Sequence, residues 1–304
     1  MNNLQKLSGP AVPLGALRYT DLIMLADFAK KSGLGLIQLL PVNDSGTQSS
    51  PYSALSAFAL HPVYLHLEDI KGFSEIYKSD KEFKTNYDAF IAYHKDKTRY
   101  DYDEVNNSKD YFLRQIFSQT DISRNGKPSK GLSVFIEKNP WVIPYAVYKN
   151  LKYKYMQASW KSWQKEDTEL SEKEITARWE KDSSHLYYAW LQMECETQFS
   201  KSVEYCRKNN ILIKGDLPIL MNEDSCDAWC HPEIFNQELR AGSPADGENP
   251  TGQNWGFPTY NWKNLKAQNY KWWKDRLVNA GKFYDAYRLD HILGFFRIWA
   301  IPEN

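Results

Sequence analysis

Leu34-Gly35-Leu36-Ile37-Gln38-Leu39-Leu40-Pro41-Val42-Asn43-Asp44 is the stretch that decides the fold of this chain. It is an almost unbroken apolar run followed by polar residues, as expected for a strand that flanking helices bury on both faces. The preceding residues, 20–33, begin with a candidate helix N-cap, carry apolar side chains at helical spacing and end at a glycine. Together the two segments predict one helix-then-strand unit of a parallel sheet.

The same pattern returns twice later in the chain. Residues 186–208 carry an apolar helical stripe, and a strand is expected over Ile211–Pro218. A third helix is expected over residues 270–281, followed by a strand over residues 283–289. Three such units predict a parallel α/β fold.

Polar side chains follow each of these strands, namely Asn43 and Asp44, then Asp216, then Arg288 and Asp290. In a (β/α)₈ TIM barrel the carboxyl ends of the strands meet at the face that holds the active site. A doubly wound open sheet would also bind ligands there, but no glycine-rich phosphate loop follows any of these strands. We therefore expect a TIM barrel.

Residues 72–185 differ from the rest by their charge-rich stretches and by a capping box that starts at Ser171. We expect an inserted helical subdomain there. Residues 1–71 would then form the first part of the catalytic barrel, and residues 186–304 its continuation.

The charge balance indicates an uncharged ligand. The chain has 38 basic and 38 acidic residues, so neither nucleic acid nor an anionic membrane is expected as a partner. Aromatic residues make up 15% of the chain, and flat rings with a polar edge suit the apolar faces of sugars as well as protein cores.

Cysteine content and hydropathy favour a cytoplasmic protein. No run approaches the length of a membrane span, and the polar start does not resemble a secretory signal. Four cysteines form no disulfide framework. Cys226, Cys230 and His231 lack a second ligand pair at zinc spacing, so we expect no metal site there.

Arg288-Leu289-Asp290 is the candidate catalytic motif. Residues two apart on a strand share a face, and the arginine favours the ionised form of the carboxylate. An ionised carboxylate suits a nucleophile in sugar chemistry. A purely structural ion pair is the alternative for a motif this short.

Four segments in order resemble the amylomaltase, or 4-α-glucanotransferase, family (glycoside hydrolase family 77). They are Ser50–Ala59, Gly215–Ser225, Gly252–Pro258 and Arg288–His291. The amino-acid sequence of residues 254–262 and 290–299 looks most like the maltose-using branch of this family, which is known from plant cytosol and certain bacteria.

The resemblance implies a role for each matching residue. Asp290 matches the catalytic nucleophile, Arg288 the residue that keeps it ionised, and Asp216 a supporting carboxylate at a neighbouring strand end. Tyr52 resembles the ring that stacks on the sugar at the cleavage point. The residues matching the glucan cleft are Asp224, Gln253, Trp255 and His291.

Some of these residues have structural alternatives. Asp216 and Asp224 both follow strand ends, where a carboxylate can simply cap loop amides. Trp255 can equally have a structural role, as a rigid ring against which its glycine-rich loop packs. The implied substrates are maltose, malto-oligosaccharides or glucan.

The chain departs from the family pattern in three places. Near the start, Leu14–Thr20 lacks a short loop that usually precedes the first barrel helix in the family. Residues Ser243–Pro250 replace a loop that usually carries two aromatic rings, which puts the grip on long glucans in doubt. The family's general acid lies on a later strand, and the sequence ends at Asn304, fourteen residues after Asp290. Glu303 does not match the acid motif. We therefore expect an N-terminal portion of a longer enzyme, with a barrel incomplete at its C-terminus, that folds poorly and is inactive when made alone.

The leading hypothesis is a retaining 4-α-glucanotransferase that passes a glucosyl unit from one sugar to another. A hydrolase of the same clan would use water as the acceptor. A non-catalytic glucan-binding protein is the alternative from a different class.

Overall fold

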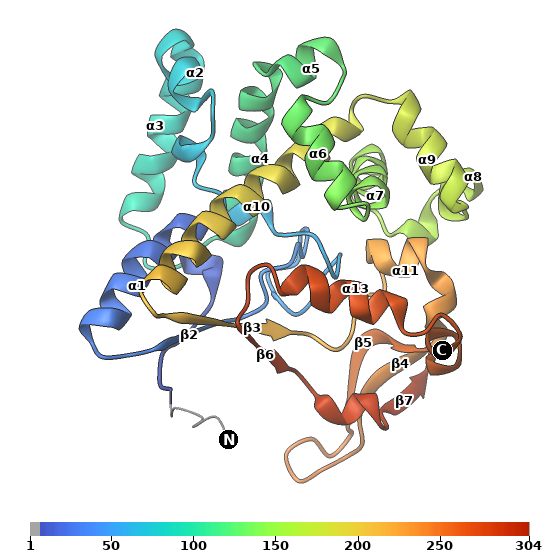
Figure 1. The fold of residues 1–304 in the computed structure, drawn as a ribbon. Helices are drawn as coiled ribbons and strands as arrows, with labels where there is room; N and C mark the ends of the chain where they lie inside the picture. The colour runs from blue at the N-terminus through green and yellow to red at the C-terminus, as the bar shows by residue number, and fades with distance from the viewer. Residues whose placement is uncertain (1–6, 304) are drawn as a thin grey trace.

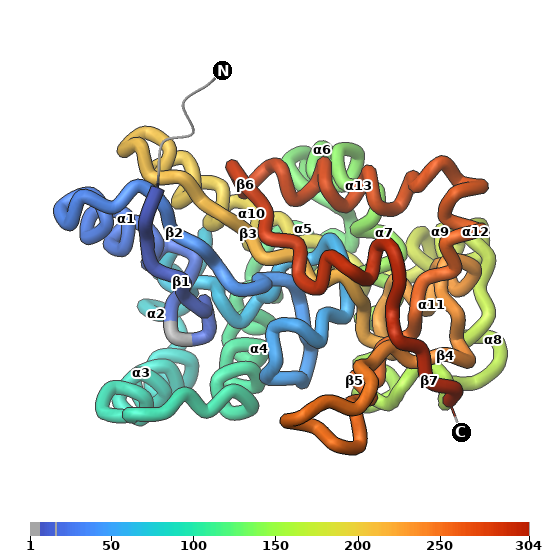
Figure 2. The backbone as a smooth tube through the Cα atoms, turned by 90° about the horizontal axis from the view of Figure 1, so that it is seen from below, coloured from blue at the N-terminus to red at the C-terminus, as the bar shows by residue number. Residues whose placement is uncertain are grey.

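The chain forms a parallel sheet in the strand order of a barrel. The computed structural model describes residues 7–303. Its parallel sheet has the order β1-β2-β3-β6 (Figures 1 and 2). The strands are β1 (Ala11–Val12), β2 (Leu36–Leu39), β3 (Leu212–Leu217) and β6 (Ala286–Leu289). Each new strand joins the same edge of the sheet, whereas a doubly wound sheet reverses direction. These are four neighbouring strands of a (β/α)₈ barrel, which the described residues do not close.

The three predicted helix-then-strand units are confirmed. Helices α1 (Leu22–Lys31), α10 (His185–Lys208) and α13 (Lys271–Ala280) precede β2, β3 and β6. Figure 1 shows α10 and α13 on one side of the sheet, and Figure 2 shows the strands from the opposite side. Strand β1 was not predicted, because two residues are too few to show an alternating pattern.

The expectation that β2 is buried on both faces was wrong. Ile37 and Leu39 are buried, whereas Leu36 and Gln38, which point to the other face, are partly exposed. Helices cover only one face of the sheet, and the other face would be covered by the remaining strands of a closed barrel. The continuous apolar run is therefore what a strand of a closed barrel requires. In the four strands described here, only one of its two faces is buried.

The residues between β2 and β3 are predominantly helical. The helices are α2 (Phe73–Ser79), α3 (Lys81–Lys95), α4 (Tyr102–Ser118), α5 (Asp121–Asn125), α6 (Lys130–Lys138), α7 (Val142–Lys154), α8 (Lys165–Thr168) and α9 (Glu172–Lys181). The capping box at Ser171 is present, with Glu174 as its partner. Buried side chains of α4 and α6 belong to the same apolar cluster as those of α1 and α10. The division into subdomains stays a prediction.

A second, antiparallel sheet was not predicted. It has the order β5-β4-β7 and consists of β4 (Phe235–Ser243), β5 (Gln253–Tyr260) and β7 (Trp299–Pro302). Strand β5 contains Gly256 and Pro258, two residue types that are depleted in strands, so its sequence reads as a loop.

Short helices complete the fold. The α-helices are α11 (Cys226–Cys230) and α12 (Trp262–Ala267), and the 3₁₀ helices are η1 (Leu14–Ala16), η2 (Tyr19–Asp21), η3 (Pro62–Tyr64), η4 (Leu67–Asp69), η5 (Trp160–Ser162), η6 (Pro232–Ile234) and η7 (Ile292–Phe295). Across residues 7–303, none of the helices combines the length and the apolar character that a membrane crossing requires.

Gly215 of β3 is required by the ring that packs on it. A Cβ atom at this position would lie 2.3 Å from Cδ2 of Tyr284, which is buried. We expect Gly215→Ala to lower the free energy of unfolding by about 1–3 kcal/mol, because overpacking forces the ring or the strand to move. Urea unfolding measures this change. Gly247→Ala is the matched control, since a Cβ there meets open space; equal effects of the two variants would contradict the packing argument.

Candidate active site

The register of β3 and β6 places Arg288 between two carboxylates. Asp216 lies directly beside Arg288 on the neighbouring strand. Nη1 of Arg288 forms an ion pair with Oδ2 of Asp216, and its Nη2 lies 2.9 Å from Oδ1 of Asp290. One guanidinium therefore holds a carboxylate from each strand, which uses the fork geometry of arginine.

Tyr52 joins this group from a loop far away in the sequence. Its hydroxyl donates a hydrogen bond of 2.8 Å to Oδ2 of Asp216 and lies 3.4 Å from Nη1 of Arg288. Burial raises the pKa of Tyr52, and the hydrogen bond to Asp216 raises it further. Burial opposes the charge of Arg288, but the hydrogen bond and charge of Asp216, together with Tyr52 and Asp290, outweigh this effect and raise the pKa of Arg288. The structure thus brings together four of the predicted site residues.

Exposure distinguishes the two carboxylates. Asp216 is fully buried, whereas the side chain of Asp290 is 36% exposed. A ligand can therefore reach Asp290 but not Asp216, which is covered and held by Tyr52 and Arg288. This arrangement suits one reacting carboxylate and one supporting carboxylate.

His291, Trp255 and Gln253 form a second group next to Asp290. His291 has a φ of 47°, in the left-handed region that non-glycine residues rarely adopt, so the chain turns sharply after Asp290. The rings of His291 and Trp255 meet edge to face with centroids 4.9 Å apart. Nε1 of Trp255 donates to Oε1 of Gln253 at 2.8 Å. The antiparallel sheet therefore contacts the end of β6 through these side chains.

Asp224 is held by the helical segment instead. Its Oδ2 lies 2.6 Å from Nζ of Lys152, and its Oδ1 accepts a 2.8 Å hydrogen bond from the backbone N–H of Trp160. Both oxygens thus have partners outside the Tyr52 and Trp255 groups. The structure explains what anchors Asp224, and its place in a glucan cleft stays a prediction.

A buried carboxylate, Asp44, fixes the loop that carries Tyr52. Asp44 accepts hydrogen bonds from Tyr145 Oη at 2.7 Å, Lys149 Nζ at 2.8 Å and Gly46 N at 2.8 Å. Burial raises the pKa of Asp44, but the charge of Lys149 and these hydrogen bonds lower it well below its usual value. Sequence reasoning placed Asp44 only at a strand end, because its partners on α7 lie about a hundred residues away.

His61 completes the support of this loop. Its Nδ1 accepts from the N–H of Val63 at 3.2 Å, and its Nε2 lies 2.6 Å from the hydroxyl of Tyr102. That hydroxyl donates to the carbonyl of Gly46 at 2.7 Å. The contacts define a neutral imidazole that donates through Nε2. Burial lowers the pKa of His61 to about 4, despite the nearby Asp44.

His61 predicts a pH dependence of stability. Its pKa is about 6.5 in the unfolded chain and about 4 in the folded chain, so the unfolded state binds the proton more tightly. The contribution of His61 to the free energy of unfolding is therefore fully present above pH 6.5. It decreases by about 3 kcal/mol as the pH falls to 4. Urea unfolding at several pH values measures this slope. His61→Gln should be less stable at neutral pH and should show a smaller slope; an unchanged slope would contradict the assignment.

Glu303 has a structural explanation. It pairs with Arg240, and its Oε1 lies 3.4 Å from Nζ of Lys161. Both cations also bind Glu223. These ion pairs connect β7 to β4, and they agree with leaving Glu303 out of the catalytic residues. No group of three potential metal-binding side chains, from His, Cys, Asp and Glu, occurs within the described part of the chain.

Sequence comparison identifies relatives along almost the whole chain. The family model described as 4-alpha-glucanotransferase matches residues 7–304. The 4-alpha-glucanotransferase DPE2 of Oryza sativa subsp. japonica is 34% identical, over 98% of this chain and 32% of that protein. A 4-alpha-glucanotransferase of Chlamydia caviae is 36% identical, over 94% of this chain and 53% of that protein. The chain therefore spans about a third to a half of the length of these relatives.

Solved structures share the fold. The amylomaltase of Streptococcus agalactiae, in complex with acarbose, matches 98% of this chain and 62% of its own with a TM-score of 0.79 and 23% identity. The amylomaltase of Corynebacterium glutamicum matches 98% of this chain and 42% of its own, with a TM-score of 0.80 and 21% identity. With the family model covering nearly all residues, this chain belongs to the 4-alpha-glucanotransferase family, glycoside hydrolase family 77.

Proposed function

We propose that this chain supplies the nucleophile, its supporting residues and part of the sugar-binding surface of a retaining 4-α-glucanotransferase. The observation that carries the proposal is the exposed carboxylate of Asp290, which is ion-paired to Arg288 beside the covered Asp216. Family membership supplies the reaction class.

In this reaction an oxygen of Asp290 attacks the anomeric carbon of an α-1,4-linked glucosyl unit. The bond from that carbon to the leaving sugar oxygen breaks, and the glucosyl group stays on Asp290 as an ester. The 4-hydroxyl of an acceptor sugar then attacks the same carbon, which releases Asp290 and restores the α configuration. Arg288 orients the carboxylate of Asp290 through Nη2, because its Nη1 is bound to Asp216.

A second carboxyl group, about 5 Å away, has to protonate the leaving oxygen and later accept the proton of the acceptor. We assign no described residue to this role. Asp216 is fully buried and bound by Tyr52 and Arg288, and Glu303 is paired with Arg240 in the second sheet.

The proposed substrates are maltose, malto-oligosaccharides or glucan. Tyr52 bonds to Asp216, and the partly exposed Trp255 contacts His291, the residue after Asp290; both offer rings on which sugars can stack. The balanced charge of the chain favours an uncharged substrate over nucleic acid or a membrane surface. A cytoplasmic location is supported by the four free cysteines, which suit a reducing compartment. Family membership supports a role in starch, glycogen or maltose metabolism.

Product analysis tests this function. The natural gene product that contains this chain is incubated with maltotriose and an excess of isotopically labelled glucose. Transfer predicts labelled maltose and longer labelled oligosaccharides. Hydrolysis would release glucose without label in the oligosaccharides, and a glucan-binding protein would bind maltotriose without turnover; either result would contradict the proposal.

A further inference from the structure

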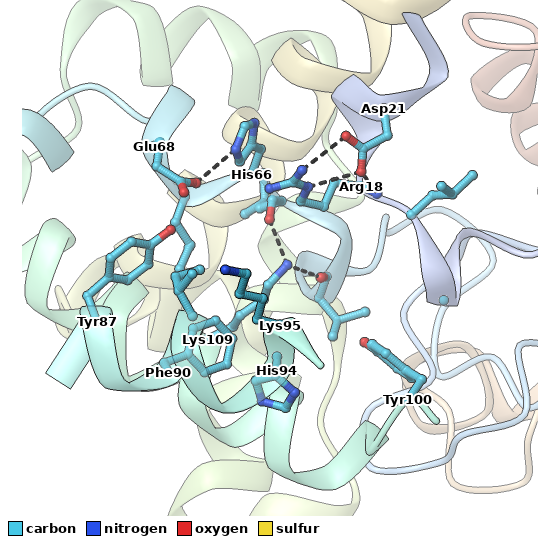
Figure 3. Close-up of a pocket in the computed structure, with 16 residues that line it drawn as sticks. Arg18, Asp21, His66, Glu68, Tyr87, Phe90, His94, Lys95, Tyr100 and Lys109 are labelled. Carbon is cyan, nitrogen blue, oxygen red and sulfur yellow. Dashed lines mark hydrogen bonds and ion pairs between the residues drawn. The ribbon is translucent and has the colours of Figure 1, made fainter. Parts of the chain in front are cut away.

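A polar cavity lies apart from the candidate active site. Its volume is about 450 Å³, and it shares no lining residue with the Tyr52 and Trp255 groups. It is enclosed by the segment before α1, by residues 63–68, and by helices α3 and α4 (Figure 3). No catalytic step described above uses this cavity.

Most charges around the cavity are neutralised within the chain. Nε of Arg18 lies 3.0 Å from a carboxylate oxygen of Asp21, and Nε2 of His66 lies 2.9 Å from Glu68. His94 is paired with a glutamate of α4. These groups form a polar rim without a net excess of charge.

Lys109 and Lys95 are the exceptions. Lys109 is only 8% exposed, and its Nζ donates to two backbone carbonyls, Val63 O at 2.7 Å and Leu65 O at 2.8 Å. Neither lysine has an ion-pair partner within residues 7–303. Two cationic side chains therefore line one cavity without an ion pair to either, while the two lining carboxylates, Asp21 and Glu68, are paired with Arg18 and His66 (Figure 3).

A buried ammonium without a counter-charge is costly, because carbonyl dipoles replace only part of its lost hydration. Burial lowers the pKa of Lys109 to about 7, and the charge of Arg18 contributes. An ammonium has three N–H donors, and two of them are used by the carbonyls. Glu68 and Asp21 favour the charged form from a distance, but neither forms an ion pair with Lys109. The remaining donor is therefore available to an anion.

The aromatic residues that line the cavity indicate the chemistry of the part of the ligand that carries no charge. Tyr87, Phe90 and Tyr100 supply aromatic surface beside the charged groups. Rings with polar edges suit the apolar faces of a sugar. A cavity of about 450 Å³ has room for a small metabolite, whereas a free inorganic phosphate would leave most of it empty.

We propose that this cavity binds a phosphorylated sugar of hexose size, with its phosphate at Lys109 and Lys95 and its ring against the tyrosines. The proposal is independent of the reaction at Asp290. It gives the protein a second small-molecule site, for a charged ligand, whereas the substrate proposed for the Asp290 site is uncharged.

Isothermal titration calorimetry on the natural gene product that contains this chain tests this site with glucose 6-phosphate, glucose and inorganic phosphate as probes. We expect glucose 6-phosphate to bind most tightly and glucose not to saturate. Lys109→Met should weaken binding about tenfold or more, since it removes a hydrogen bond from a charged group. Lys95→Gln should weaken it severalfold, and affinity should fall with added salt. Lys81→Gln is the matched control, because Lys81 is an exposed lysine of α3, the helix that carries Lys95.

Several outcomes would overturn the proposal. These are an affinity for glucose equal to that for glucose 6-phosphate, no saturable binding, or competition by maltotriose, which would place the ligand in the glucan cleft. If Lys109→Met fails to fold, the surface variant Lys95→Gln decides. Unchanged affinity in Lys95→Gln together with binding that is independent of salt would contradict a site built on these two charges.

Discussion

Replacement of Asp290 by asparagine in the natural gene product that contains this chain is expected to reduce glucosyl transfer by about a thousandfold or more. The amide keeps the shape of the side chain, but it cannot form the glucosyl ester. Arg288 would lose one of its two carboxylate partners and keep Asp216. The initial rate of maltotriose disproportionation measures the effect.

Asp275→Asn is the matched control, because Asp275 lies on α13 and pairs with an exposed lysine. Its activity should remain close to that of the unchanged protein. Maltotriose binding by Asp290→Asn should be largely retained, since the change removes a reacting group and no ring. Full activity in Asp290→Asn would exclude a nucleophilic role for this residue.

Asp44→Asn is expected to give the largest loss of stability, about 3–5 kcal/mol, because it breaks a buried ion pair and leaves one charge uncompensated. Asp44 is 1% exposed and binds Lys149, which is itself largely covered. The loop that carries Tyr52 would lose its anchor to α7. Urea unfolding of the natural gene product that contains this chain measures the change.

A double variant separates the ion pair from general damage to the core. Asp44→Asn combined with Lys149→Met removes the unpaired ammonium, so it should be more stable than Asp44→Asn alone. Asp121→Asn, in an exposed ion pair, should change stability by less than about 1 kcal/mol. A double variant less stable than Asp44→Asn would contradict the account of this network.

Local sequence patterns were sufficient for the barrel units. The apolar stripes and stop signals of α1, α10 and α13, and the apolar runs after them, depend on neighbours in the sequence, and all three units are present. Strand β1 and the antiparallel sheet were missed for opposite reasons. The first is too short to show a period, and β5 contains glycine and proline, so pairing with β4 determines its conformation.

The candidate site was predicted in its residues rather than in its contacts. The spacing of Arg288 and Asp290 placed both on one face, and they form an ion pair. The direct contact between Arg288 and Asp216 depends on the register of β3 and β6, which no local pattern encodes. The network of Asp44 is also formed by long-range contacts, which a single sequence does not reveal.

The central claim is that Asp290 is the nucleophile. An α-glucosyl fluoride with a second fluorine at C5 tests it most directly, since fluoride leaves without an acid and the trapped ester reacts slowly. The natural gene product that contains this chain is treated with this reagent, digested and analysed by mass spectrometry. We predict one glucosyl adduct, on the peptide that contains Asp290, and none in Asp290→Asn. An adduct on another carboxylate, or no adduct at Asp290, would contradict the claim.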